Sequence, residues 1–263
     1  MNKCCLITGS SGLIGKWLAK NLIYYHEVVR LNHETCDLST NFSTRNFPIK
    51  VDVVIHLAQS NYIHNFPEYS EDIFTVNTSS TMKLLDYAKR AGASTFIYAS
   101  SGNVTIEKKP SFYTVTKLCA ENLAKLYSPY LDVIIFRPFY VYGPGQKSSR
   151  LIPKLVSAIQ KGEPILLRGR NGFQFNPIYV TDAVNCFIKA ISLTKSETID
   201  IAGPEILTLK DAANIIGEYL NIEPVFKIIP GHAENFVGNI EKQSELFGLP
   251  QIPFHEGIKE MLV

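Results

Sequence analysis

Three glycines at three-residue spacing separate an apolar segment from an amphipathic one near the start of the chain. Residues 4–8 have the pattern of a short strand, Gly9, Gly12 and Gly15 follow, and residues 13–24 have the periodicity of a helix. Such a turn presents free amides at the positive end of a helix, where the phosphates of a dinucleotide can bind. Gly9 permits the tight turn, Gly12 lets a pyrophosphate approach, and Gly15 lets helix and strand pack closely. The feature predicts a Rossmann-like α/β fold.

The first half of the chain continues the alternation of strand and helix. We expect strands at 3–8, 27–31, 52–57, 94–99 and 132–136 and helices at 13–24, 70–91 and 112–128. This order builds βαβ units and a doubly wound parallel sheet, here a dinucleotide-binding part over residues 1–145. Residues 33–50 are polar and weakly periodic, so the second helix should be short or absent.

The pattern changes after residue 145. The second half predicts a helix at 151–161, a strand at 164–168, a loop at 169–173 and helices at 181–193 and 208–220.

A tyrosine and a lysine stand four residues apart in the helix predicted at 112–128. Tyr113 and Lys117 therefore lie on one face of that helix, where the ammonium can lower a phenol pKa that is ordinarily about 10. Tyr113 then becomes usable as a general acid or base near neutral pH. Ser101 follows the strand predicted at 94–99, at the edge where open α/β sheets place catalytic groups, and is the expected hydrogen-bond donor to a substrate oxygen.

With these motifs the chain resembles an extended short-chain dehydrogenase/reductase of the NAD-dependent epimerase/dehydratase family, and it is similar to UDP-galactose 4-epimerase and to the 4-keto-sugar reductases. The resemblance covers nearly the whole chain. It is carried by Thr8-Gly9-x-x-Gly12-x-x-Gly15, Val54-Ile-His-Leu-Ala58, Val76-Asn77, Phe96 to Ser101, Tyr113-x-x-x-Lys117, Arg137-Pro-Phe-Tyr-Val-Tyr-Gly-Pro144 and Ile178-Tyr-Val-Thr-Asp182. It implies that residues 146–263 form a small substrate-binding part, interleaved with the first rather than independent.

The resemblance also implies an NAD cofactor, with NADP as the alternative. The implied cofactor-binding residues are Gly9, Gly12, Leu13, Ile14, Gly15, Asn32, Asp37, Leu57, Ala58, Asn77, Tyr113, Lys117 and Pro138. Asn32 ends the second strand, where an acidic side chain usually accepts from the ribose and repels a 2′-phosphate, so the choice of cofactor stays open. Asp37 matches a position that binds adenine, or is a local cap. His56 is expected beside the cofactor or in a satisfied core hydrogen bond.

Implied substrate-binding residues are Ser101, Asn103, Tyr140, Arg150, Arg168 and Arg170. Two positions depart from the family pattern, because Tyr140 replaces an asparagine and Phe175 replaces the arginine that grips a substrate diphosphate. Phenylalanine has no donors, so one of the three arginines must substitute, unless all three are solvated charges. Residues 102–112 are fewer than usual between Ser101 and Tyr113, and we expect a compact turn with Glu107, Lys108 and Lys109 in solvent.

Elimination narrows the reaction. Sugar 4,6-dehydratases place an Asp-Glu pair after the catalytic hydroxyl, whereas this chain has Gly102 and Asn103, so dehydration is disfavoured. What remains is hydride transfer at one carbon, which the resemblance implies to be C4 of a nucleotide-activated sugar. A 4-epimerase is the first hypothesis, an NADPH-dependent 4-keto-sugar reductase the second, and a non-catalytic dinucleotide-sensing protein a remote third.

Composition points to an ordinary globular enzyme. The 263 residues carry a net charge of +2, which favours neither nucleic acid nor a membrane surface as partner. The first strand begins too early to leave room for a signal peptide, and the five cysteines fit reduced thiols of a cytoplasmic protein. No metal site is expected. The resemblance implies a homodimer formed through the helices at 70–91 and 112–128.

Overall fold

The computed structural model describes residues 2–106 and 109–262. The chain forms two compact units, one made of Met1–Arg137 and Val184–Ile199 and the other of Pro138–Ala183 and Asp200–Val263. We expected the division after residue 145, whereas the units divide where the fifth strand ends at Pro138. The segment 184–199 returns to the first unit.

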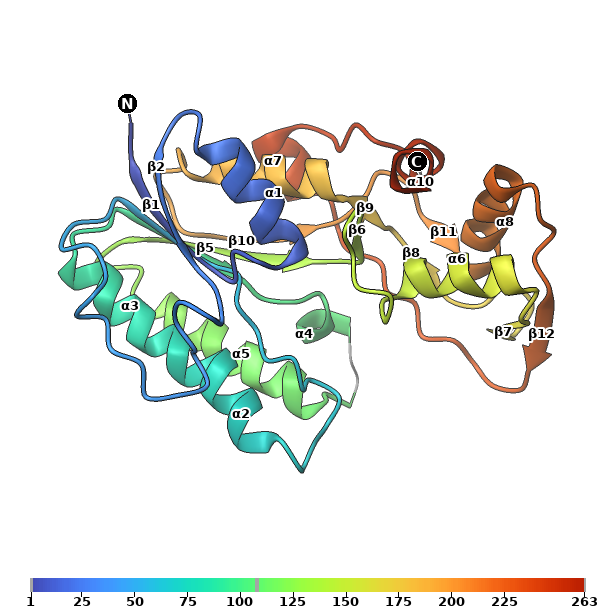
Figure 1. The fold of residues 1–263 in the computed structure, drawn as a ribbon, viewed down its shortest axis with the longest axis horizontal. Helices are drawn as coiled ribbons and strands as arrows, with labels where there is room; N and C mark the ends of the chain where they lie inside the picture. The colour runs from blue at the N-terminus through green and yellow to red at the C-terminus, as the bar shows by residue number, and fades with distance from the viewer. Residues whose placement is uncertain (1, 107–108, 263) are drawn as a thin grey trace. The chain divides into compact units, whose positions relative to one another are not determined.

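Six strands form the central sheet of the first unit (Figure 1). Their order is β2 (Glu27–Leu31), β1 (Cys4–Thr8), β3 (Val53–His56), β4 (Thr95–Ala99), β5 (Asp132–Pro138) and β10 (Glu197–Ile201). The pairs from β2 through β5 are parallel. This is the Rossmann-like doubly wound sheet that the glycine spacing predicted. Since β1 lies between β2 and β3, the chain leaves β1 toward one edge and later returns toward the other, which makes the carboxyl ends of β1 and β3 the switch point.

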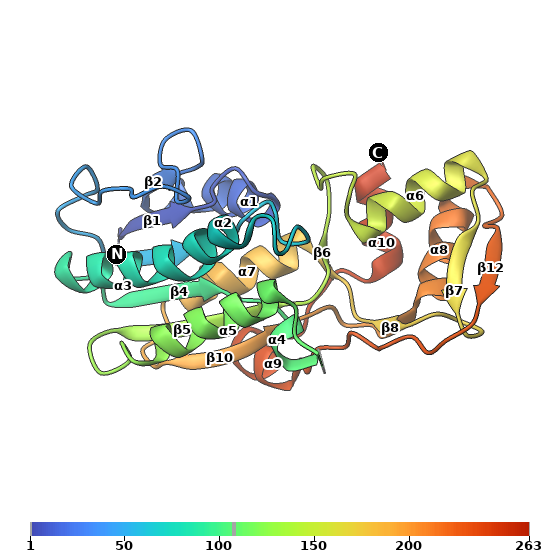
Figure 2. The ribbon, with the colours of Figure 1, turned by 90° about the horizontal axis from the view of Figure 1, so that it is seen from below.

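Helices cover both faces of this sheet (Figures 1 and 2). The helices α1 (Leu13–Leu22) and α7 (Val180–Ala190) lie on one face. On the other lie α5 (Phe112–Lys125) and a continuous helical run composed of α2 (Ser70–Phe74), the π-helix η1 (Thr75–Ser79) and α3 (Ser80–Arg90). The helix predicted at 70–91 is thus confirmed, with a π-helical turn in its middle that the sequence did not indicate.

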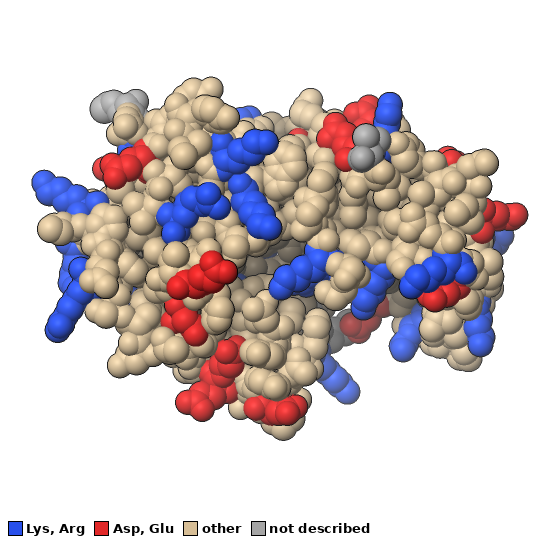
Figure 3. All heavy atoms as spheres, in the orientation of Figure 1, with Lys and Arg blue, Asp and Glu red and all other residues tan. Residues whose placement is uncertain are grey.

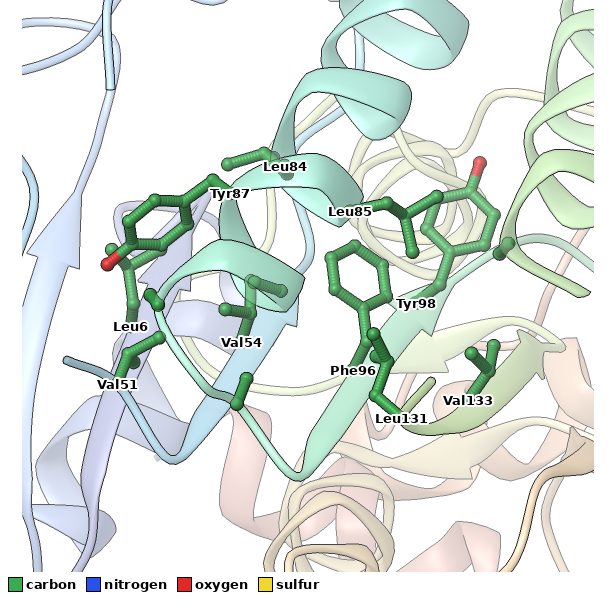
Figure 4. Packing of buried hydrophobic residues seen from close by; sticks show 14 of the residues in the cluster. Leu6, Val51, Val54, Leu84, Leu85, Tyr87, Phe96, Tyr98, Leu131 and Val133 are labelled. Atoms are coloured by element: carbon green, nitrogen blue, oxygen red, sulfur yellow. The ribbon is translucent and has the colours of Figure 1, made fainter. Parts of the chain in front are cut away.

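Alternating residues of the strands build the core beneath α3 and α5 (Figure 4). Leu6, Val54, Phe96 and Val133 are neighbours in register across four strands and are buried. They pack with apolar side chains of the two helices, namely Leu84, Leu85, Ala88, Ala120 and Ala124. Each large apolar side chain buried here contributes about 1.5–3 kcal/mol, so this layer holds α3 and α5 firmly on the sheet.

The second unit is built from short elements. Its strands pair two by two: β6 (Val141–Tyr142) with β9 (Ile178–Tyr179), β7 (Ile165–Arg168) with β12 (Phe226–Ile229), and β8 (Gln174–Phe175) with β11 (Leu207–Thr208). Its helices are α6 (Leu151–Lys161), α8 (Leu209–Leu220), α9 (Glu241–Phe247) and α10 (Phe254–Leu262). A reciprocal capping box between Thr208 and Asp211 fixes where α8 begins.

Several expectations can be judged from these elements. No helix lies between β2 and β3, as the polar segment 33–50 indicated. A one-turn helix, α4 (Asn103–Ile106), stands where we expected a turn, and Glu107 and Lys108 lie outside the described residues.

Within the described residues none of the five cysteines forms a disulfide; Cys5 and Cys186 are buried, whereas Cys119 is exposed. Over residues 2–106 and 109–262, no cluster of metal-ligating side chains is present, and no helix is long and apolar enough to span a bilayer.

Candidate active site

The glycine turn has the geometry that its spacing predicted. Gly9 has a φ of +66°, and a Cβ on it would come within 2.7 Å of the Ala58 nitrogen on the neighbouring strand end. A Cβ on Gly15 would come within 2.3 Å of the Gly9 oxygen, so α1 could not approach β1 so closely. Gly12 differs, because a Cβ there would meet only the Gly9 oxygen, at 3.3 Å. Packing within the chain thus gives little reason for glycine at this position, whereas close approach by a ligand would.

The start of α1 is open to an anion. Gly12 is the N-cap and offers no side chain to the first turn, which also contains no acidic residue. The amides of Leu13, Ile14 and Gly15 are therefore left uncapped by the chain at the positive end of the helix. A bare helix start beside a side-chain-free Gly12 fits the pyrophosphate of a dinucleotide.

Asn32 and Asp37 follow β2 and are engaged in local turns. Asn32 Oδ1 accepts from the Thr35 amide at 2.9 Å. Asp37 Oδ1 accepts from the amide and hydroxyl of Ser39 at 2.9 and 2.7 Å, and the hydroxyl bond is the main reason that the pKa of Asp37 is lowered. The local-cap interpretation of Asp37 therefore describes its contacts, while a role toward adenine stays a prediction.

Two side chains of the sheet, Thr8 on β1 and His56 on β3, and Thr81 on α3 support the end of β3. His56 is fully buried between Thr8, whose Oγ1 lies 2.7 Å from Nδ1, and Thr81, whose Oγ1 lies 3.0 Å from Nε2. Burial lowers the pKa of His56 to about 3, and the charge of Lys117 acts in the same direction, so the ring is neutral. Thr8 Oγ1 also accepts from the Ala58 amide at 3.4 Å. His56 thus makes the satisfied core hydrogen bonds that we expected, and it holds the segment of Leu57 and Ala58.

Asn77 lies on η1 and joins two parts of the site. Its Oδ1 accepts from the Ser60 amide at 3.0 Å, and its Nδ2 donates to Thr116 Oγ1 at 3.1 Å. All three residues are buried. Since Thr116 precedes Lys117 on α5, Asn77 links the loop after β3 to the helix of the tyrosine and the lysine.

Tyr113 and Lys117 are brought together as predicted. They lie one turn apart on α5, with exposed fractions of 8% and 1%. Ser111 caps the helix by accepting from the Thr114 amide, which places Tyr113 in the first turn. Lys117 Nζ donates to the Ala99 oxygen at the end of β4 at 2.8 Å. Ser101, two residues further on, accepts from the Asn103 amide at 3.3 Å.

Lys117 is a buried base with an unusual environment. Burial lowers its pKa to about 7, while the charge of Glu121 raises it. Glu121 is fully buried and accepts a two-pronged bond from Arg137, with Nε at 2.9 Å from Oε1 and Nη2 at 2.7 Å from Oε2. Burial alone would raise the pKa of Glu121, but the hydrogen bonds of Arg137 and Ser100 and the charges of Arg137 and Lys125 together outweigh it, and the pKa is lowered. Lys117 therefore has a fixed negative charge one turn further along its helix.

The remaining predicted residues belong to the second unit or its boundary. Pro138 ends β5. Tyr140 has a φ of +41°, rare for a residue with a side chain, and its ring lies within 5.0–6.0 Å of the rings of Phe173, Phe175 and Phe236. Phe175 is fully buried in this aromatic cluster. Arg150, Arg168 and Arg170 are exposed. On the face shown in Figure 3 the basic and acidic side chains are interspersed over each unit.

Two contacts of the site were not predicted from the sequence. The Tyr113 hydroxyl donates to Gln59 Oε1 at 3.2 Å, and Arg137 pairs with Glu121. Gln59 follows the end of β3, and its place at the carboxyl edge of the sheet could have drawn attention to it. Glu121 stands at helical spacing after Lys117, but its partner on β5 could not be inferred from spacing.

The chain matches a known protein family over most of its length. The sequence profile of the "NAD dependent epimerase/dehydratase family" matches residues 5–202, a range that contains every predicted site residue. The chain belongs to this family. It is accordingly an NAD-dependent enzyme of the extended short-chain dehydrogenase/reductase class, and its expected cofactor agrees with the family description.

Relatives of this epimerase/dehydratase family member act on nucleotide sugars. GDP-6-deoxy-D-talose 4-dehydrogenase of Aggregatibacter actinomycetemcomitans is 28% identical over 218 residues, which cover 74% of this chain and 73% of that protein. UDP-N-acetyl-alpha-D-glucosaminuronate decarboxylase of Bacillus cytotoxicus is 26% identical over an alignment that covers 100% of this chain and 97% of that protein.

A solved structure gives the same fold. UDP-glucuronic acid 4-epimerase from Bacillus cereus, in complex with UDP-glucuronic acid and NAD, superposes with a TM-score of 0.82 at 23% identity. The match covers 98% of this chain and 97% of the epimerase. The Rossmann-like fold class predicted from the sequence is thereby confirmed.

Proposed function

We propose that this protein is a nucleotide-sugar 4-epimerase that uses bound NAD. The observation that carries the proposal is the buried pair of Tyr113 and Lys117 on α5, in the same unit as the open glycine turn and Ser101. A phenol beside an amine that is nearly excluded from water is suited to moving a proton rather than to packing alone. The 4-epimerase that shares the fold, and the 4-dehydrogenase among the relatives, support C4 as the reacting carbon.

The side chains take the following roles. Tyr113 accepts the proton of the C4 hydroxyl and returns it after the keto-sugar has rotated to present its other face. Lys117, in its protonated form, holds the negative form of Tyr113, and Ser101 donates a hydrogen bond to the sugar oxygen. When bound, NAD supplies the acceptor and later the donor of the C4 hydride.

Binding of that cofactor is assigned to the open edge of the sheet. We propose that the first-turn amides of α1 hold the pyrophosphate beside Gly12, and that Asn32 and Asp37 face the adenosine. Leu57 and Ala58 would line the ribose side, Asn77 would support them, and Pro138 would border the nicotinamide. The support is the bare helix start and the small Ala58 against Gly9.

Substrate recognition is proposed to depart from the family pattern. Asn103, two residues after Ser101, begins α4, and Tyr140 lies in an aromatic cluster where the family pattern has an asparagine. Because Phe175 cannot donate, we propose that an exposed arginine holds the diphosphate, with Arg150, Arg168 and Arg170 as the candidates.

The first experiment identifies the dinucleotide and tests Tyr113. Protein purified without added cofactor is denatured, and the released dinucleotide is identified by absorbance and mass. Near-stoichiometric NAD supports the epimerase, because that cycle regenerates its cofactor. Tyr113→Phe should then lower kcat on UDP-hexoses by about 100-fold or more, the range for loss of a general acid–base, while the exposed control Tyr24→Phe leaves it unchanged. Wild-type turnover by Tyr113→Phe would contradict the assignment.

A second candidate is an NADPH-dependent 4-keto-sugar reductase. Asn32 favours it, because an amide at the end of β2 does not repel a 2′-phosphate as a carboxylate would. A protein that is purified empty and then binds NADPH more tightly than NADH would identify the reductase, since a reductase consumes its cofactor in every cycle.

We also propose a cytoplasmic homodimer. Exposed apolar side chains gather on α2, α3 and α5, namely Phe74, Met82, Val115 and Leu118. A surface of this kind is typical of a helix–helix interface. The five cysteines, none of them in a disulfide within the described residues, fit a reducing compartment. Light scattering of the purified protein checks the dimer.

A further inference from the structure

Gln59 is the side chain that meets the Tyr113 hydroxyl. It is half-buried, directly after Ala58 at the carboxyl end of β3, and its Oε1 accepts from Tyr113 Oη at 3.2 Å. Tyr113 and Gln59 come from different elements, so the contact depends on how the loop after β3 is held against α5.

That loop is held by buried polar contacts on both sides of Gln59. Before it, the Leu57 amide donates to the Thr8 oxygen at 3.3 Å. After it, the Ser60 amide donates to Asn77, and the Ser60 hydroxyl donates to Asp72. Asn77 in turn donates to Thr116, which lies on α5 between Tyr113 and Lys117. The backbone of Gln59 is therefore fixed relative to the helix that carries the phenol.

An amide can serve both protonation states of a phenol. Its oxygen accepts from a neutral hydroxyl, and its NH2 group donates to a phenolate after the terminal torsion turns over. A carboxylate can only accept, and a leucine of similar size can do neither. Lys117, when protonated, can only donate, so it cannot accept the hydrogen bond of the neutral hydroxyl. Gln59 thus supplies an acceptor for the phenol proton, which the lysine cannot.

We propose that Gln59 is a positioning residue that keeps the Tyr113 hydroxyl aligned in both its protonated and its ionised form. This inference rests on the proposed function, in which Tyr113 moves a proton. In the neutral state the amide oxygen orients the phenol proton. In the ionised state the turned amide donates to the phenolate, together with Lys117.

Two substitutions separate the two halves of this role. Gln59→Leu removes both partners, and kcat should fall by about tenfold with KM and bound dinucleotide unchanged, as expected for one lost hydrogen bond. Gln59→Glu keeps an acceptor but adds a negative charge that opposes the phenolate, so the pH at which kcat reaches half its maximum should rise by about one unit or more. Gln160→Leu and Gln160→Glu, at an exposed position of α6, are the matched controls and should change neither quantity.

Two outcomes of these measurements would contradict the role proposed for Gln59. If both Gln59 variants keep kcat within twofold and the same pH profile, the proposal is wrong. If they lose activity together with dinucleotide and melting temperature, while the pH midpoint of the residual activity stays in place, Gln59 has a structural role only and the proposal is again wrong.

A readout without turnover keeps this test separate from the proposed function. Tyrosinate formation is followed by ultraviolet difference absorbance, and each protein is compared with the same protein carrying Tyr113→Phe, which isolates one of the 13 tyrosines. Gln59→Glu should move the isolated titration to higher pH even if no sugar substrate is turned over. An unmoved titration overturns the Gln59 inference, whereas absence of turnover in the wild type overturns only the epimerase assignment.

Discussion

Replacing Arg137 by methionine should destabilise the first unit strongly, because it leaves Glu121 charged and buried. Both guanidinium contacts to Glu121 are shorter than 3 Å, at 2.9 and 2.7 Å, and the exposed fractions of the two side chains are 18% and 0%. Removing one partner of a buried ion pair costs about 3–5 kcal/mol. Lys125, 3.6 Å away with a side chain 48% exposed, remains and offsets about 1 kcal/mol at most. The expected loss is therefore about 2–4 kcal/mol.

Urea unfolding followed by tryptophan fluorescence measures this loss in the relevant unit. The single tryptophan of the chain is Trp17, on α1 of the first unit, so its signal reports that unit. Free energies come from linear extrapolation to zero urea. Arg170→Met, at an exposed arginine, is the matched control and should change the value by less than about 0.5 kcal/mol.

A second substitution tests the cause. Glu121→Met in the Arg137→Met background removes the stranded charge and should recover most of the stability, because apolar replacement of a whole buried pair is often neutral. The pKa of Glu121 is lowered in the folded protein, so the pair stabilises above the ordinary carboxyl pKa of about 4.3 and this is lost as pH falls. The gap between wild type and Arg137→Met should accordingly narrow below about pH 4. A loss under 1 kcal/mol, or a double variant no more stable than the single one, would refute the reasoning.

Two further predictions concern the cofactor turn and the lysine. Gly15→Ala should lower the thermal stability of the protein, because its Cβ would meet the Gly9 oxygen at 2.3 Å. Gly12→Ala should keep near-wild-type stability and lose affinity for the dinucleotide. Thermal melts measure the first effect, and titration with NAD measures the second. Because burial lowers the pKa of Lys117 to about 7, the unfolded chain binds more protons than the folded one between that value and the ordinary pKa of about 10.4. The dinucleotide-free protein should therefore gain stability relative to Lys117→Met as pH rises through this interval, and a gap that stays constant would show that Lys117 is protonated in the fold.

The sequence was most informative where local chemistry and fold coincide. Gly9 and Gly15 are required by backbone geometry, and the strand and helix around them follow from periodicity alone. The pair of Tyr113 and Lys117 could also be predicted, because a spacing of four residues is that of one helical turn. These features determined the fold class and the side of the sheet on which the site lies.

Other features left no local trace. The two-residue strands β6, β8, β9 and β11 are too short to show alternation, so the second unit could be outlined only by its helices. Gln59 and Arg137 reach their partners across the fold, and no spacing in the sequence joins residue 59 to 113 or 137 to 121. The π-helical turn was hidden because its residues fit an ordinary helix equally well.

The π-helical turn η1 changes the direction in which side chains point along the helical run from Ser70 to Arg90. An ordinary α-helix advances about 100° per residue, so one additional residue in a turn rotates everything after it by that angle. Here the rotation separates the half that presents Asn77 to Ser60 and Thr116 from the half that seats Leu84 and Leu85 on the sheet. If one residue were deleted from η1, the helix could keep either the hydrogen bonds of Asn77 or the packing of Leu84 and Leu85 on the sheet, but not both.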